Sequence, residues 1–450
     1  MTLPALPPQG STNWYGHYSA MDGLLRQSGP AQTTDKILYV ATHGSDSNDG
    51  LSWGGALATL PAAFSKLGFG PGTIEVGAGT FSTSGMVPNG GQVIRGRGRT
   101  ATTLQLSATG TLINLSGVTG VRMEHLGLKF ATTSVTGTLI NLSNTFTCDF
   151  VDVQLTGLSQ TTGQVGVSLT NNAGDSRFSS CFFDNLDVGV QADSTVNYLI
   201  GCVLTGNNTA AQGGDASGAV HASGLVATDC VFRGTGNFYV NVLGTAQQWH
   251  LKGCWFDSAA TTAVQVGSGT YGPWLFSMTD IPYLAGSTKS LVLNAADNVE
   301  LRGVVFGNSG SNPTDLTVAA ANCPKGTLGA YKSLQGYKIE TLVPVTWQGA
   351  RGYAQSADGS VSLLESYERM NVSITPLTRR RMVIRIVNRT TASTQDVITF
   401  PSAFETTFGG GQFAKTFDNS GITGLTLTAS SITFPAGVAC ASGVIVLEGF

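Results

Sequence analysis

Charged side chains are scarce in this chain. Lys and Arg number 24 and Asp and Glu 27, which together make 11% of the 450 residues, against about 25% in an ordinary soluble domain. The formal net charge is −3, so electrostatics gives no reason to expect nucleic acid or an anionic membrane as a partner. A composition this poor in charge suits stacked strands and turns, with much of the surface uncharged or covered by other subunits.

Long apolar runs are also missing. No stretch approaches the roughly 18 apolar residues that a membrane-spanning helix needs, so we expect no membrane insertion. The start of the sequence, MTLPALPPQG, has neither the basic region nor the apolar run of a signal peptide. The sequence therefore predicts synthesis and folding in the cytoplasm, whatever the later destination of the protein.

Motifs for metals and cofactors are absent or incomplete. His221 and His250 do not have the spacing of zinc ligands. The DSNDG string at 46–50 resembles half a calcium loop, but Leu57 stands where the twelfth-position Glu would be. RGRGR at 95–99 lacks the third glycine of a dinucleotide fingerprint. We predict no metal and no cofactor.

What the sequence does contain is a repeat marked by cysteine. Four of the seven cysteines recur at steps of 21, 28 and 24 residues: Cys181, Cys202, Cys230 and Cys254. The alignment extends to Leu126 and Val151 before them and to Met278 and Val304 after them, with a mean step of about 25 residues, the turn length of a solenoid. An odd number of cysteines at this spacing argues against a disulfide framework. We expect them to be reduced and to fill an interior ladder.

The residue after each repeat anchor should point outward, because side chains alternate along a strand. These positions are unusually apolar: Phe182, Val203, Val231, Trp255 and Val305. Such a row should not face water. We predict that it packs against two other copies in a homotrimer; cover by a long loop of the same chain is the alternative.

The parts before the repeats predict an attachment segment and a cap. In residues 1–35 an apolar stripe at steps of 4, 3 and 4 suggests a short helix that needs a partner to be stable: Trp14, Tyr18, Met21 and Leu25. A frayed terminus is the alternative. An amphipathic helix near 59–67, with Thr59 as its N-cap, should cover the open first turn of the solenoid.

The string YVATHGSDSNDGLSW…LATLPAAF, followed by VIRGRG and the repeats, resembles the pectin-lyase-like right-handed parallel β-helix, and within it the tailspike and minor tail proteins of phages. The N-terminal MTLPALPPQGSTNWYGHY is similar to the start of minor tail proteins. The resemblance implies a virion tail component that attaches through its N-terminus to tail or baseplate proteins and contacts a glycan of the host envelope. No residues can be carried over for calcium-assisted β-elimination, since the R-x-P-x-x-R and W-I-D-H strings of pectate and pectin lyases are missing from the repeats; a glycoside hydrolase or a lyase of another kind stays open.

The chain then divides into a β-helix over 36–310, a linker over 311–337 and a C-terminal region over 338–450. Short strands without the repeat period predict that this last region is an antiparallel β-sandwich, of jelly-roll type. The fold class is therefore all-β. Arg379, Arg380 and Arg381 begin one of its strands, either as a solvated turn or as a contact for an anion or glycan.

Two groups of polar residues could act on a glycan. The alignment puts Glu124 and Asp149 at the same outward position of neighbouring turns, with Asp152 on the same edge, and paired carboxyls are what glycoside hydrolysis requires. The alternative is that they are solvated polar residues or a structural calcium site. Asp184, Arg233 and Asp257 form a second row that could either grip a polysaccharide or bridge turns. We therefore expect a tail adhesin, with a glycan depolymerase and a purely structural tail component as alternatives.

Overall fold

The computed structural model describes the chain from residue 36. It covers 36–158, 160, 163–214, 223–234, 236–243, 246–259, 261–267, 271–307, 314–318, 322–323, 325–328 and 331–333, and then the C-terminal strands given below. The segment predicted to attach to the virion, 1–35, lies outside the described residues, and with it the stripe of Trp14, Tyr18, Met21 and Leu25.

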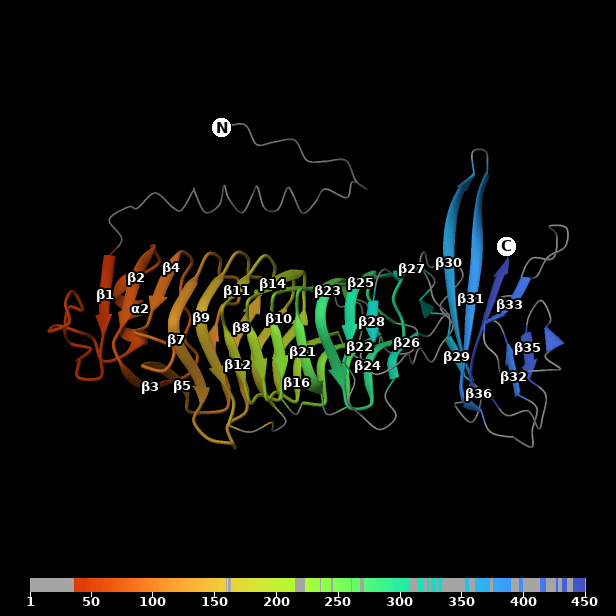
Figure 1. Ribbon diagram of the computed structural model, residues 1–450. Helices are drawn as coiled ribbons and strands as arrows, with labels where there is room; N and C mark the ends of the chain where they lie inside the picture. Colours follow the sequence, from red (N-terminus) through yellow and green to blue (C-terminus); the bar gives the residue numbers. More distant parts are fainter. Residues whose placement is uncertain are drawn as a thin grey trace.

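Residues 36–333 form a parallel β-solenoid, seen along its length in Figure 1. One wall is a nine-stranded sheet: β6 (Gly110–Asn114), β8 (Gly137–Ser143), β10 (Gln164–Thr170), β13 (Val188–Asp193), β16 (Thr209–Gly213), β19 (Phe238–Val242), β22 (Thr262–Val266), β24 (Lys289–Leu293) and β26 (Thr314–Val318). Neighbouring strands of this sheet pair in parallel. The prediction of a parallel β-helix is confirmed.

The other strands of the solenoid belong to a 19-stranded sheet that bends sharply at one corner in every turn. Its strands are β1 (Lys36–Val40), β2 (Gly72–Val76), β3 (Gly79–Thr83), β4 (Gln92–Arg95), β5 (Thr102–Leu106), β7 (Arg122–Phe130), β9 (Asp149–Thr156), β11 (Arg177–Ser179), β12 (Phe182–Asp184), β14 (Val196–Ile200), β15 (Val203–Thr205), β17 (Ser223–Thr228), β18 (Val231–Arg233), β20 (Ala246–Lys252), β21 (Trp255–Ala259), β23 (Leu275–Gly286), β25 (Asn298–Phe306), β27 (Lys325–Leu328) and β28 (Tyr331–Ser333).

At this corner the backbone takes a left-handed conformation once per turn. The corner residues are His125, Asp152, Ser180, Gly201, Asp229, Gly253, Asp280 and Gly303, with φ between 52° and 65°. Gly, Asp and Asn adopt this region more readily than other residues. The corner therefore fixes the register of every turn, because the residue after it always points into the core.

The corner corrects two members of the predicted ladder. Leu126 pairs with Val153 rather than with Val151, and Val304 pairs with Ile281 rather than with Met278. In these turns the alignment selected an apolar residue two or three positions before the true anchor. The interior column thus runs Leu126, Val153, Cys181, Cys202, Cys230, Cys254, Ile281 and Val304, all buried.

The four stacked cysteines are free thiols with no exposed surface. Each donates to a main-chain carbonyl of the turn before: Cys181 to Phe150 at 3.4 Å, Cys202 to Phe178 at 3.2 Å, Cys230 to Leu199 at 3.5 Å and Cys254 to Ala227 at 3.4 Å. A thiol is small and apolar but keeps a weak donor. Cysteine at this position fills the core and also donates a weak hydrogen bond to the neighbouring turn.

The N-terminal end of the solenoid is covered by a helix, as predicted. Helix α2 runs over Leu60–Leu67, and Thr59 Oγ1 accepts a hydrogen bond from the amide of Ala62. Leu60 and Phe64 are buried on its inner face. Asp46 accepts hydrogen bonds from the Thr59 amide and hydroxyl, both at 2.9 Å, so the DSNDG string serves as a support for the start of the cap.

Strands continue into the segment predicted to be a linker. β26 pairs with β24, and β27 and β28 pair with β25, all in parallel. The solenoid therefore extends past residue 310, to at least Ser333 among the described residues. Among these residues, no helix is long and apolar enough to cross a membrane.

The C-terminal region contains two antiparallel sheets. One holds β29 (Tyr353–Gln355), β30 (Val361–Val372), β31 (Thr375–Arg389), β33 (Phe413–Phe417) and β36 (Cys440–Gly449), and the other β32 (Asp396–Thr399), β34 (Thr426–Leu427) and β35 (Ser431–Phe434). The antiparallel pairing agrees with the predicted sandwich; a jelly-roll connection remains a prediction. Arg379, Arg380 and Arg381 lie within β31.

Candidate functional site

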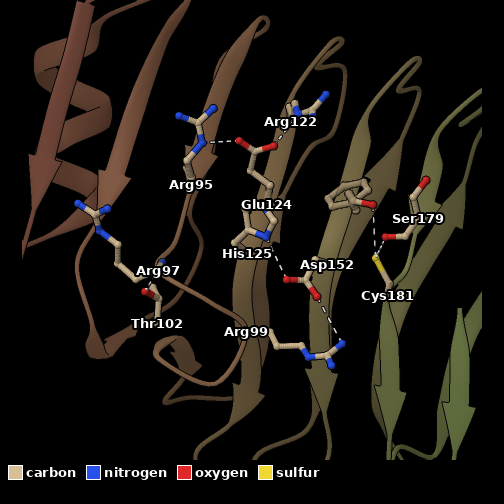
Figure 2. A network of polar contacts seen from close by, with 11 residues as sticks. Arg95, Arg97, Arg99, Thr102, Arg122, Glu124, His125, Asp152, Ser179 and Cys181 are labelled. Carbon is tan, nitrogen blue, oxygen red and sulfur yellow. Dashed lines mark hydrogen bonds and ion pairs between the residues drawn. The ribbon is translucent and has the colours of Figure 1, made fainter. Parts of the chain in front are cut away.

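A cluster of charged side chains lies where β4, β7 and β9 approach the corner (Figure 2). We call it the corner cluster, and its members are Arg95, Arg99, Arg122, Glu124, His125 and Asp152. Arg95 comes from β4, Arg122 and Glu124 from β7, and His125 and Asp152 are the corner residues of β7 and β9. Arg99 reaches in from the loop between β4 and β5.

Glu124 is the centre of one half of the cluster. Its side chain is only 6% exposed, and its two oxygens accept hydrogen bonds from Arg95 Nε and, at 2.9 Å, from Arg122 Nε. Arg95 also contacts Glu75 at 2.9 Å. Burial by itself would raise the pKa of Glu124, but the two guanidinium groups outweigh it and hold that pKa below its usual range. Glu124 is therefore an ionised anchor for the two arginines.

Asp152 is the centre of the other half. Its carboxylate accepts from His125 Nδ1 at 3.0 Å and lies 3.4 Å from Arg99 Nη1. The guanidinium of Arg99 also stacks on the ring of Phe182, 3.9 Å from its centroid. With Nδ1 donating to Asp152, the other imidazole nitrogen of His125 is the acceptor in the neutral tautomer.

A short glycine-containing loop, residues 96–101, carries two arginines to this edge. The Gly96 amide donates to the Glu124 carbonyl at 2.9 Å and the Gly98 amide to the His125 carbonyl at 2.8 Å. A Cβ on Gly96 would lie 2.3 Å from that same His125 carbonyl oxygen, so no larger residue fits there. The RGRGR string is thus a scaffold that points successive arginines at different partners.

The register shows where sequence alignment misplaced a predicted site residue. Glu124 pairs with Val151, and Asp149 pairs with Arg122, so Glu124 and Asp149 do not occupy equivalent positions. The expectation that they form a facing carboxyl pair rested on the wrong anchor in β9. The pKa of Glu124 is also lowered, whereas a general acid requires a raised pKa. Asp152 does lie at the same edge, as predicted.

The second predicted row lies on the far side of the corner. Asp184 pairs with Thr205, and Thr205 pairs with Arg233, so Asp184 and Arg233 share one outer row two turns apart. Asp257 follows Phe256, the partner of Phe232. Burial raises the pKa of Asp184, and the charge of Arg233 partly offsets this. The row is therefore spread along the solenoid rather than gathered at one point.

The apolar outer row is present in the predicted register. Phe182 pairs with Val203, Val203 with Val231, and Val231 with Trp255. Trp255 in turn pairs with Tyr283, which the alignment missed because the register of β23 shifts between Ile281 and Leu284, and the ring centroids of the pair lie 5.0 Å apart. Trp255 is 43% exposed. Val305 lies on the strand that follows, β25, next to the buried Val304.

Within the described residues, no group of three His, Cys, Asp or Glu side chains is placed to hold a metal ion.

What distinguishes the corner cluster is which of its charged groups are buried and which are exposed. The carboxylate of Glu124 is buried, while Arg95 and Arg122, which hold it, are 46% and 47% exposed, and His125 is 49% exposed. In the Glu124 half the anion lies inside and the two cations lie outside, whereas Asp152 and Arg99 are about equally exposed, at 33% and 36%.

No protein-family model matches the sequence, and no curated protein matches it. The solved structures similar to this chain include the A-module of a mannuronan C-5 epimerase of Azotobacter vinelandii, at 13% identity over 65% of this chain and 93% of that one, with a TM-score of 0.44. A tailspike protein of the Acinetobacter baumannii bacteriophage Fri1, a capsular polysaccharide depolymerase, is similar at 12% identity over 93% and 86%, with a TM-score of 0.40. A Geobacillus virus E2 protein has 11% identity over 87% and 77%, with a TM-score of 0.43. At such values, no activity of these proteins transfers to this chain.

Proposed function

We propose that this chain is a phage tail protein whose β-helix binds an acidic glycan of the host envelope. The observation that carries the glycan-binding part is the polarity of the corner cluster, in which a buried, ionised Glu124 and a half-buried Asp152 orient exposed guanidinium groups. Guanidinium groups recognise carboxylates through two parallel hydrogen bonds. Arg95 and Arg122 come from neighbouring turns of the solenoid, along which an extended polymer could run. The tail location rests on the sequence resemblance alone.

Assembly as a homotrimer belongs to the same proposal. The outer row from Phe182 to Trp255 is apolar over consecutive turns, and Arg99 covers only its first member. Apolar surface of this kind is characteristic of interfaces between subunits. Attachment to tail or baseplate proteins through residues 1–35, and contacts of Asp184, Arg233 and Asp257 with the glycan, are proposed from the sequence.

Two single substitutions test the glycan-binding proposal. Arg122→Ala leaves Arg95 on Glu124, and Arg99→Ala leaves His125 on Asp152, so the fold keeps one partner for each carboxylate. We expect each to weaken binding of carboxylated polysaccharides (polygalacturonate, alginate and hyaluronate) about tenfold, the loss of one charge-assisted contact. Calorimetric titration of the full chain measures this.

The matched control is Arg302→Ala. Arg302 is an exposed arginine on β25, far along the solenoid from the corner cluster, with Glu300 4.0 Å away. The Arg302→Ala substitution removes the same charge and should leave the affinity for these polysaccharides unchanged. Equal loss in all three variants would mean that only net charge matters, and equal binding of neutral dextran would contradict recognition of acidic groups.

Cleavage of the same glycan is a second candidate function, and the His125–Asp152 contact favours it. In a β-elimination, the free imidazole nitrogen would take the C5 proton of a uronate. The electron pair would form the C4–C5 double bond, and the C4–O bond would break, with the leaving oxygen taking up a proton. Hydrolysis through Glu124, Asp149 and Asp152 is less well supported, because Glu124 is held ionised. If the protein releases reducing ends and His125→Ala abolishes the release, cleavage would be established. If the protein binds the glycan without releasing reducing ends, it would be an adhesin and not an enzyme.

A further inference from the structure

A hollow of about 430 Å³ lies beside the corner at the N-terminal end of the solenoid. It is lined by Ala41, Thr42, His43, Trp53, Gly77, Ala78 and Arg97, and we call it the Trp53 hollow. Its volume is within the range of about 300–1,000 Å³ that small-ligand pockets occupy. None of its polar residues belongs to the corner cluster or to the rows predicted from the sequence.

Arg97 stands at this hollow in a fixed position. Its guanidinium carbon lies 4.6 Å from the centroid of the Trp53 ring, an arrangement that combines stacking with attraction between the cation and the ring face. Its amide donates to Thr102 Oγ1 at 2.9 Å, and that buried hydroxyl donates to the carbonyl of Gly77, also at 2.9 Å. Both ends of Arg97 are therefore held before any ligand arrives.

The guanidinium of Arg97 differs from those of its neighbours in the RGRGR string. Arg95 and Arg99 each contact a carboxylate, whereas within the described part of the chain no carboxylate oxygen lies within 4.0 Å of Arg97. A guanidinium offers five donors in a planar fork that matches a carboxylate. Stacking on Trp53 occupies the face of this fork and leaves its edges for an anion.

The rest of the hollow suits a sugar ring. The Trp53 ring is itself braced by the edge of Tyr39, at 4.7 Å and 63°. His43 Nε2 lies 3.2 Å from the Trp53 carbonyl, which fixes the imidazole at the rim, where it can hydrogen-bond a hydroxyl. Gly77 and Ala78 keep the floor open, since a Cβ on Gly77 would lie 3.3 Å from Trp53.

We propose that the Trp53 hollow is a subsite for one carboxylate-bearing sugar of the glycan, with the sugar carboxylate on Arg97 and a hydroxyl on His43. This inference deepens the proposed function. Arg97 lines the hollow, Arg99 belongs to the corner cluster, and both come from the loop 96–101, so one glycan chain would reach from the hollow to the cluster. The hollow would select for acidic sugars at one position, whereas the corner cluster would hold the polymer.

Trigalacturonate and its methyl ester test this directly, because the ester removes the charge and keeps the sugar. We expect the full chain to bind trigalacturonate and to bind the ester at least tenfold more weakly. Arg97→Ala should abolish this preference. Arg97→Lys should restore only part of it, since an ammonium lacks the fork. Arg302→Ala is the matched control and should change nothing.

A blocking variant separates binding from folding. Ala78 is exposed on the lining, so Ala78→Glu should keep the melting temperature while repelling the carboxylate, and should weaken trigalacturonate binding about tenfold or more. Equal affinity for acid and ester, or unchanged affinity in Arg97→Ala and Ala78→Glu, would overturn the subsite. If polysaccharide binding still depends on Arg122, the proposed function would survive that result. If trigalacturonate binds and its binding needs Arg97, but no polysaccharide binds, the subsite would be supported and the proposed function would be wrong.

Discussion

Replacing Glu124 by Gln should destabilise the protein by about 1–3 kcal/mol near neutral pH. The side chain is 6% exposed, and both of its oxygens accept from arginines. Gln keeps one acceptor oxygen but presents an NH₂ group to the second guanidinium. The range reflects loss of a charged hydrogen bond with partners that are themselves half exposed. Urea unfolding followed by circular dichroism measures the change.

The pH dependence of this difference follows from the direction of the pKa shift. The pKa of Glu124 is lower in the folded state than in the unfolded chain, so the unfolded state binds the proton more readily. The stability that this carboxylate contributes is present above its unfolded pKa of about 4 and is lost as the pH falls through the lower folded pKa. The gap between wild type and Glu124→Gln should therefore narrow in acid.

Glu300→Gln provides the matched control for this prediction. Its side chain is 43% exposed and its nearest cation, Arg302, is 4.0 Å away. An exposed pair of this kind should contribute less than about 1 kcal/mol at any pH. If both variants lost the same stability, or if the Glu124→Gln deficit grew in acid, the assignment of Glu124 as an ionised anchor would be wrong.

Replacing Trp255 by Asp should dissociate the proposed trimer. Trp255 is 43% exposed and stacks on Tyr283 in the middle of the apolar outer row. An aspartate there would put a desolvated charge at each of three equivalent contacts, which is costly when no partner cation is present. Light scattering should give about three times 46.6 kDa for the wild type and about one third of that for the variant.

Ile200→Asp separates the interface from the mere loss of an apolar surface residue. Ile200 is 37% exposed and lies on the outside of β14, on the opposite side of the corner from Trp255. Its substitution should leave the trimer intact. A wild-type chain with the mass of a monomer, or a trimer that survives Trp255→Asp, would instead favour cover of the row by a segment of the same chain.

The sequence predicted the solenoid because the same position of the repeat is cysteine in four turns. Four identical residues at similar steps reveal the turn length even without an alignment of relatives. The same signal failed in the turns of Val151 and Met278, where an apolar residue near the right place was accepted as the anchor. A better marker was available: Ser180, Gly201, Asp229 and Gly253 immediately precede the cysteines and are the corner residues. Extending that series would have selected Asp152 and Asp280, and hence Val153 and Ile281.

The charged contacts were less predictable for a physical reason. The RGRGR string resembles an incomplete dinucleotide fingerprint, and nothing in the neighbouring sequence shows that its three arginines have three different partners. Their partners lie 29 and 53 residues later in the sequence for Arg95 and Arg99, and 44 residues earlier for Arg97. Stacking of turns brings them together, and one error of register in β9 was enough to pair Glu124 with Asp149. Only coordinates could reveal that the acidic member is buried and the basic members exposed.

Binding of acidic polysaccharide by the full chain at two salt concentrations tests the central claim most directly. The account predicts that polygalacturonate binds, that its affinity falls as the salt rises because the exposed guanidinium groups are screened, and that dextran does not bind. Equal affinity for the charged and the neutral polymer, or no binding of any carboxylated polysaccharide at low salt, would contradict it.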